Sequence, residues 1–265
     1  MLYGVLQHSG AELSAHQMIK AEQERWTSIA QIAAEYETIA VVAQRDRWIS
    51  LLEGCGLTDE QVEQVLASDS FGPLTAELRR AEANHHDVEQ LLLKLVARRS
   101  LDDAEDIGAV LISRIQHETP RPKRGKRRVE ARLIAGLMPI ADGPMTDEMA
   151  TALRERPGLI EDRADALAKA ADEHGEPWLK RLGEPPVVPA ARQRWLGELR
   201  TVAAYRDRYR IDTRTALGDD PRTDAQKLDA ARAEQAIRRA RAIAAAASGQ
   251  APRSRAVTAR WPVIH

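Results

Sequence analysis

Apolar side chains recur at three- and four-residue intervals along most of the chain, which is the spacing of a helix that buries one face. The clearest apolar set is Ile29, Ile32, Ala33, Tyr36, Ile39, Ala40 and Ala43. Ser14 with Gln17 has the spacing of a capping box, and Gly54 follows the apolar pattern as a helix stop. We therefore predict one long helical stretch over residues 14–53.

Further start signals divide residues 54–117 into shorter helices. The pairs with capping-box spacing are Thr58 with Gln61 and Asp87 with Gln90. Pro73 suits a first helical turn. The acidic residues of "LDDAEDIGAVLISRI" (101–115) suit the positive N-terminal end of a helix. Together with the first stretch, these segments predict an N-terminal helical bundle over residues 1–117.

A second helical unit is predicted over residues 133–247. Its first helix contains Pro157, which we expect to kink or split it, and Gly175 is its stop. The next helix is predicted to have one apolar side, formed by Trp195, Leu199, Val202 and Tyr209. A capping box at Thr223 then starts an Ala-rich helix with few large apolar residues, which we expect to extend from the body or fray into solvent. Residues 248–265 are predicted to be a disordered tail.

A basic segment, residues 118–132, is predicted to link the two units. Its core "TPRPKRGKRRVEAR" holds seven basic residues, one acidic residue, two prolines and a glycine. The candidate DNA-binding residues are Arg121, Lys123, Arg124, Lys126, Arg127 and Arg128. Such a run neutralises DNA phosphates without sequence specificity, yet this one lacks interleaved aromatic residues that stack on bases. A solvated linker with no partner is therefore the alternative.

Aromatic residues and prolines concentrate in residues 175–211. The aromatic residues of this stretch are Trp178, Trp195, Tyr205 and Tyr209, out of five Trp, four Tyr and one Phe in the whole chain. Because large aromatic side chains bury well where Ala cannot, we predict a small aromatic core here, with a ligand platform as the alternative. We predict that Tyr205, Arg206 and Arg208 are exposed and contact a partner protein.

Composition limits the partners and the cellular compartment. The 39 basic and 40 acidic residues nearly cancel to a formal charge of −1, so only a local patch is expected to attract nucleic acid, and no membrane contact is expected. The single Cys55 excludes a disulfide framework and a Cys-rich zinc site. The sequence has no long apolar run and no secretory signal pattern. We expect a cytoplasmic, all-α protein; its oligomeric state is left open.

The sequence contains no recognisable catalytic motif. Gly125–Lys126 is the only Gly–Lys pair, and neither the preceding Gly nor the following Ser or Thr of a phosphate-binding loop is present. His85, His86 and Glu89 are close enough in the sequence to be candidate metal ligands. An exposed turn at the start of a helix is the better interpretation of these residues. The acidic residues of 102–106 are better explained as partners of a helix dipole than as a magnesium site. We predict no catalytic residue, no metal site and no cofactor, and interpret Cys55 as a structural thiol.

Several strings of the chain resemble one protein family in the same order. These are "SGAELSAHQMIKAEQER", "AAEYETIA", "FGPLTAELRRAE", "ARRSLDDAEDIGAVL", "RLIAGLMP", "GEPWLKRLGEPP" and "VAAYRDRY". They resemble the C-terminal region of large actinobacterial conjugative relaxases of the TrwC/TraI (MobF) type, in which a DNA-nicking relaxase domain precedes a helicase. The resemblance runs from near the N-terminus to about residue 241, and "EPWLKRLGEPP" with "VAAYRDRY" is its most specific part.

The resemblance implies a module without chemistry of its own. In that family the nucleophilic tyrosine and the metal-binding histidine triad belong to the relaxase domain and the Walker motifs to the helicase, and none has a counterpart here. The implied function is a non-catalytic accessory module of a DNA-processing protein from a plasmid or mobile element. It would dock a relaxase, helicase or other conjugation protein, with weak, non-specific DNA contact as an open second role. The alternative is a structural helical remnant of a truncated relaxase gene with no retained activity. A third class is an enzyme with a site assembled from scattered residues, for which the sequence offers no nucleophile–base pair.

Overall fold

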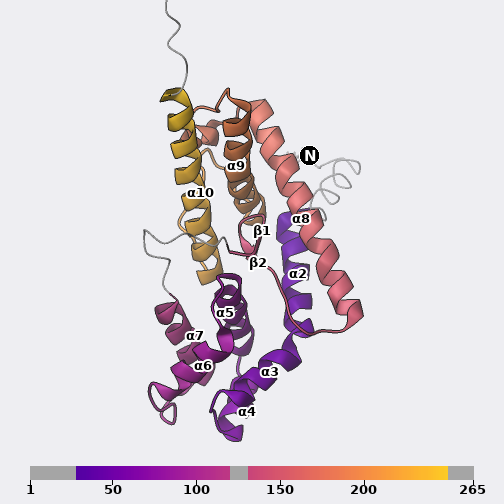
Figure 1. The fold of residues 1–265 in the computed structure, drawn as a ribbon, viewed down its shortest axis with the longest axis vertical. Coiled ribbons are helices and arrows are strands. Elements are labelled where there is room, and N and C mark those ends of the chain that lie inside the picture. Colours follow the sequence, from indigo (N-terminus) through magenta and orange to yellow (C-terminus); the bar gives the residue numbers. More distant parts are fainter. Residues whose placement is uncertain (1–27, 120–130, 250–265) are drawn as a thin grey trace, which may run out of the picture. The chain divides into compact units, whose positions relative to one another are not determined.

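The computed structural model describes residues 28–119 and 131–249, and the described chain is all-α, as predicted (Figure 1). It divides into two compact units. Unit 1 comprises Met1–Ala166 with Asp207–Arg210, and unit 2 comprises Leu167–Arg206 with Ile211–His265. This division differs from the predicted one, which placed the boundary at the basic segment 118–132, because the chain from residue 133 to residue 166 belongs to unit 1. Most of the predicted tail and most of the predicted linker lie outside the described residues.

Unit 1 is built from short helices and one small hairpin. Its helices are α2 (Ile29–Ala43), α3 (Arg45–Gly54), α4 (Asp59–Ala67), α5 (Phe71–Ala83), α6 (Val88–Ala97), α7 (Ile107–Glu118) and the first part of α8 (Asp147–His174). Strands β1 (Leu133–Ile134) and β2 (Met138–Pro139) pair antiparallel, with Ile134 opposite Met138. The main core packs α3–α7 around the fully buried side chains Trp48, Leu52, Leu74, Leu78, Leu92 and Leu95.

Two helix starts in unit 1 follow the predicted capping signals. Thr58 and Gln61 form a complete capping box at the start of α4. The Asp87 carboxylate accepts a hydrogen bond from the Gln90 amide at 3.1 Å at the start of α6. Each cap satisfies amide groups that have no partner inside the helix, which explains why local sequence was enough to place these starts.

The predicted single helix over residues 14–53 is wrong in its described part, because the chain breaks at Gln44. Gln44 leaves helical geometry at φ −104° and ψ 5°, and it is fully buried. Its side-chain amide donates to the carbonyl of Asp142 at 2.6 Å. Ser28 is the N-cap of α2, and the predicted start at Ser14 lies outside the described residues.

Helix α7 starts later than predicted. Asp106 is its N-cap and accepts a hydrogen bond from the Ala109 amide at 3.0 Å. It also accepts from the Ser70 hydroxyl at 2.7 Å, and these hydrogen bonds lower its carboxyl pKa. The acidic residues 102–105 therefore precede the helix and do not lie in its first turn.

Unit 2 contains the predicted aromatic core. Its elements are the last part of α8, the 3₁₀ helix η1 (Pro177–Leu182), α9 (Pro189–Arg208) as far as Arg206, and α10 (Asp224–Gly249). The core side chains include Trp178, Leu182, Trp195, Leu199 and Val202. Trp195 donates from its indole N–H to the carbonyl of Leu182 at 3.2 Å, which ties α9 to η1. The prediction of an aromatic core is confirmed.

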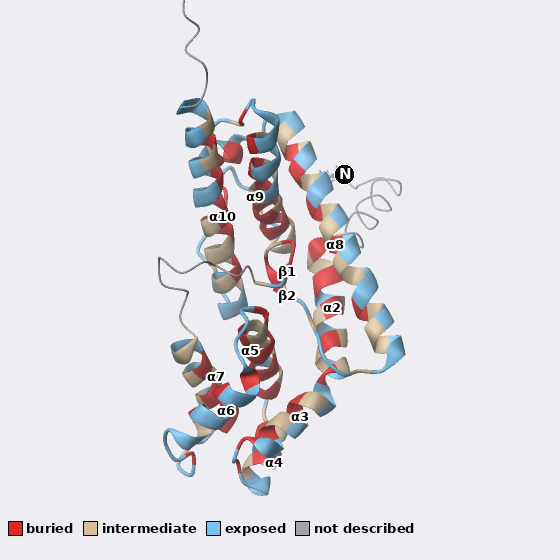
Figure 2. Cartoon of the chain, in the orientation of Figure 1, coloured by how far each residue is buried: buried red, intermediate tan, exposed pale blue. Residues whose placement is uncertain are grey.

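The prediction that the Ala-rich helix extends from the body is wrong, and the predicted split at Pro157 does not occur. Helix α10 does not extend from the body, because Ala236, Ile237 and Ala240 are buried in the core of unit 2, and Figure 2 shows its buried residues along one side. Small side chains allow α10 to pack closely against the core of unit 2. The sequence prediction missed this because the helix has few large apolar residues. Helix α8 is not split at Pro157, since it runs without interruption from Asp147 to His174.

Candidate functional site

The six cations predicted to contact DNA cannot be placed. Arg121, Lys123, Arg124, Lys126, Arg127 and Arg128 lie outside the described residues. The described chain stops at Thr119 after α7 and resumes at Ala131 before the hairpin. The prediction that this run binds DNA stays a prediction.

The residues predicted as exposed partner contacts are not exposed. Tyr205 is fully buried, and Arg206 has an exposed fraction of 9%. Arg208 keeps 10% of its side chain exposed and forms an ion pair with Glu37 at 2.6 Å. The prediction of an exposed contact surface at these three residues is therefore wrong, because Tyr205 and Arg206 are buried and Arg208 is held in an ion pair.

Arg206 has a structural role within unit 2. Its guanidinium donates to the carbonyls of Thr213 at 2.8 Å, Thr215 at 2.6 Å and Ala216 at 3.2 Å. It also lies 4.8 Å from the centre of the Trp178 ring. Burial lowers the pKa of this guanidinium, while the acidic groups around it act in the opposite direction. Arg206 thus fixes the segment after α9 to the aromatic core.

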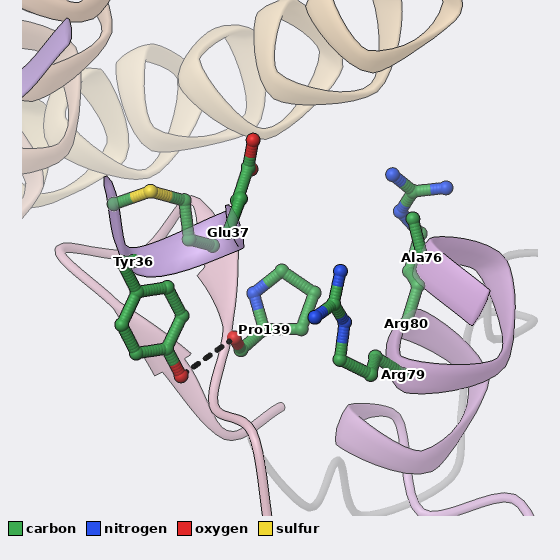
Figure 3. Close-up of a pocket in the computed structure, with 7 residues that line it drawn as sticks. Tyr36, Glu37, Ala76, Arg79, Arg80 and Pro139 are labelled. Atoms are coloured by element: carbon green, nitrogen blue, oxygen red, sulfur yellow. Dashed lines mark hydrogen bonds between the residues drawn. The ribbon is translucent and has the colours of Figure 1, made fainter. Parts of the chain in front are cut away.

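A small hollow in unit 1 brings together polar groups from three elements (Figure 3). Its lining comes from α2, α5 and β2, and consists of Tyr36, Glu37, Ala76, Arg79, Arg80, Met138 and Pro139. Ala76, Met138 and Pro139 form apolar parts of its wall, and two arginines and one glutamate supply its charges. Sequence analysis did not single out any of these residues as a site.

Tyr36 joins the hollow to the hairpin. Its hydroxyl donates to the carbonyl of Pro139 at 3.4 Å (Figure 3). It also accepts from the amide of Ala141 at 2.6 Å. Burial raises the pKa of this phenol, and the hydrogen bond from Ala141 acts in the opposite direction. Tyr36 is therefore a neutral donor and acceptor that holds the wall of the hollow in place.

Two of the three charged side chains of the hollow are neutralised by ion pairs. Glu37 pairs with Arg208, which belongs to the same unit. Arg80 pairs with Glu77, whose carboxylate also accepts from the side-chain amide of Gln116 at 3.0 Å. Arg79 takes part in neither of these ion pairs.

Arg79 is the remaining charged side chain of the hollow. It has an exposed fraction of only 6%, and its Nη1 atom has no hydrogen-bond partner among the described residues. Burial lowers the pKa of its guanidinium, and the negative charge of Glu37 partly opposes this shift. An arginine keeps its charge even when buried, so the hollow carries one positive charge without an ion-pair partner in the described chain.

The sequence offered no signal that distinguishes Arg79. The residues four positions before and after it, Thr75 and Ala83, are both buried at 1%, so Arg79 lies in a buried row of α5. In the string "TAELRRAEA" Arg79 and Arg80 look alike. Only the contact of α5 with α2 and β2 distinguishes them.

The candidate metal ligands do not form a site in the described part of the chain. No group of three or more His, Cys, Asp or Glu side chains with suitable geometry occurs there. His85 and His86 are exposed at the turn between α5 and α6, and His85 adopts a positive φ of 64°. The helices of the described ranges are also all too short or too polar to cross a bilayer.

Comparison with known proteins adds no family assignment. No protein-family model, curated protein or solved structure matches the chain. The resemblance to conjugative relaxases therefore stays a hypothesis.

Proposed function

We propose that this chain is a non-catalytic docking module of a conjugative relaxase-type DNA-processing protein. The observation that carries the proposal is the position of the two most specific strings of the resemblance. "GEPWLKRLGEPP" contributes Trp178, Leu179 and Leu182 to the core of unit 2, and "VAAYRDRY" contributes Val202 and Ala203. The first of these strings and the core-forming part of the second thus belong to unit 2.

Specific contacts join these strings. Trp195, which lies between them, donates to Leu182 of the first string, and Arg206 of the second lies over Trp178 of the first. A functionless remnant of a truncated gene has no requirement to keep such contacts, so their presence supports a functional module over the alternative.

An exposed aliphatic pair in the same region supports docking. Val187 and Val188 follow Pro185 and Pro186 directly after the first string, and they are 96% and 48% exposed. Pro186 is buried, so the base of this loop is fixed to unit 2. A pair of exposed aliphatic side chains on a proline-stiffened loop provides a small apolar contact at low entropic cost. We place the contact with the relaxase or helicase segment here.

Deletion of the gene distinguishes a functional docking module from a functionless remnant. In a donor strain that carries the chain's own mobile element, we expect deletion of its coding sequence to lower the transfer frequency. The wild-type chain supplied in trans should restore it, and the Val187→Asp/Val188→Asp variant should not. Unchanged transfer after deletion would support the remnant instead.

A further inference from the structure

The hollow between α2, α5 and β2 holds a feature that docking through unit 2 does not explain. Arg79 is more than nine-tenths buried, and Nη1 lacks a hydrogen-bond partner in the described ranges. Burial of a charged group without a partner is unfavourable, and proteins compensate such groups with a counter-charge. Arg79 therefore points to an anion that is absent from the isolated chain.

The neighbouring charges define which anion fits. Glu37 and Arg80 are already paired, with Arg208 and Glu77 respectively. Arg79 contributes a single positive charge, which a monoanion neutralises. A phosphate dianion would bring a second negative charge close to Glu37 (Figure 3).

The guanidinium and the apolar walls of the hollow agree with a small, flat group. A guanidinium presents a planar fork that matches the two oxygens of a carboxylate. Ala76, Met138 and Pro139 provide apolar surface for the carbon chain that bears it. Figure 3 shows the side chain of Arg79 beside Pro139, with Glu37 and Arg80 around the same space.

We propose that this hollow binds one carboxylate group through Arg79. The carboxylate belongs either to an acidic side chain or C-terminus of another protein or to a free small acid, and both use the same recognition. This site is in unit 1 and is independent of the docking role proposed for the Val187–Val188 loop of unit 2.

Titration of the full chain with sodium acetate at constant ionic strength tests the proposal by two-dimensional ¹H–¹⁵N NMR. We expect saturable shifts of backbone amides around Tyr36 and Arg79, at millimolar acetate. Arg79→Met should abolish them, and Arg79→Lys should weaken binding roughly tenfold because the fork is lost. The matched control Arg181→Gln removes an exposed arginine of unit 2 and should leave the titration unchanged.

Parallel titrations identify the anion and its source. Inorganic phosphate should bind more weakly than acetate, and tighter phosphate binding would overturn the carboxylate assignment. A blocked peptide with one Glu that binds much more tightly than acetate indicates a protein partner, whereas equal affinities indicate a free small acid. If Arg79→Met does not fold, the wild-type titration decides alone, since the absence of saturable shifts near Arg79 overturns the proposal.

Discussion

Arg206 shows how one buried charge organises unit 2. It donates to three carbonyls between residues 213 and 216 and stacks on Trp178. Because each of these carbonyls is oriented toward the guanidinium, the segment after α9 and the aromatic core depend on the same side chain. The charge is tolerated inside the unit because its hydrogen bonds replace those to water.

Replacement of Arg206 should destabilise the protein strongly. We expect Arg206→Met to lower the free energy of unfolding by about 2–4 kcal/mol, since it leaves buried carbonyls without donors. Urea denaturation followed by tryptophan fluorescence measures the change. Arg181→Met is the matched control, because Arg181 is 57% exposed and its pair with Glu234 is worth less than about 1 kcal/mol. Equal effects of the two changes would contradict the structural role of Arg206.

The burial of Cys55 should make the stability of the folded protein depend on pH. It is buried, its thiol donates to the carbonyl of Leu52 at 3.0 Å, and burial raises its pKa. The folded state thus holds the thiol proton more tightly than the unfolded state. The stability from this group is complete below the ordinary thiol pKa of about 8.5 and is lost as the pH rises through the raised folded-state pKa.

The free energy of unfolding is measured for the wild type and for Cys55→Ala between about pH 8 and pH 9.5. This range lies below the pKa of about 10 of ordinary tyrosine side chains, so their titration contributes little. The free energy of unfolding of the wild type should fall more steeply with pH than that of the variant. Thiol-reactive reagents should also modify Cys55 much more slowly in the folded protein than in urea. Parallel slopes and rapid modification would show that the thiol is accessible and unshifted.

The sequence predicted residue roles only where the cause was local. The capping residue Thr58 needs only its own helix, so its spacing to Gln61 was sufficient. The burial of Tyr205 and Arg206 depends on the core of unit 2 and on the segment after α9, and the neighbouring charges suggested a surface. Arg79 was missed for the same reason, since its environment is created by elements distant in the sequence.

At the scale of elements, the predicted helices are mostly present, and their ends differ where tertiary contacts decide. The break at Gln44 depends on a hydrogen bond to Asp142, far along the chain. Helix α10 looked weakly amphipathic because alanine forms its buried side. Apolar periodicity identifies faces with large side chains, and it underestimates faces that pack through small ones.

The basic segment at 121–128 makes a separate prediction at this scale. We expect weak binding to duplex DNA that falls steeply with salt, by about 0.9 log units per decade of salt for each phosphate contact. Changing Arg124, Lys126, Arg127 and Arg128 to Gln should lower the magnitude of this slope by about 3.6 if each contacts one phosphate. Fluorescence anisotropy across a salt series measures it. The matched control changes four exposed arginines outside the segment: Arg98, Arg99, Arg194 and Arg241.

Two results would contradict DNA contact by this segment. One is negligible binding at low salt, which leaves the solvated linker as the interpretation. The other is an equal loss of affinity in the control variant, which would show that general positive charge is responsible.

At the scale of the whole molecule, the two units have different proposed contacts. Unit 1 carries the hollow around Arg79, and unit 2 carries the aromatic core with the exposed loop at Val187. The sequence suggested a division at the basic segment, but the hairpin and the first part of α8 belong to unit 1. That difference arises because a change in composition marks a charged segment and does not show which elements pack together.

Docking to a relaxase or helicase segment is the role proposed for this chain, and a binding measurement can confirm or exclude it. The segment encoded by the same mobile element is purified, and its affinity for the full chain is measured by isothermal titration calorimetry. We predict saturable binding that Val187→Asp/Val188→Asp weakens by at least about tenfold, or roughly 1.4 kcal/mol. The control Val42→Asp, at a valine of unit 1 that is 56% exposed, should bind like the wild type. No binding of the wild-type chain, or an equal loss in both variants, would contradict the account.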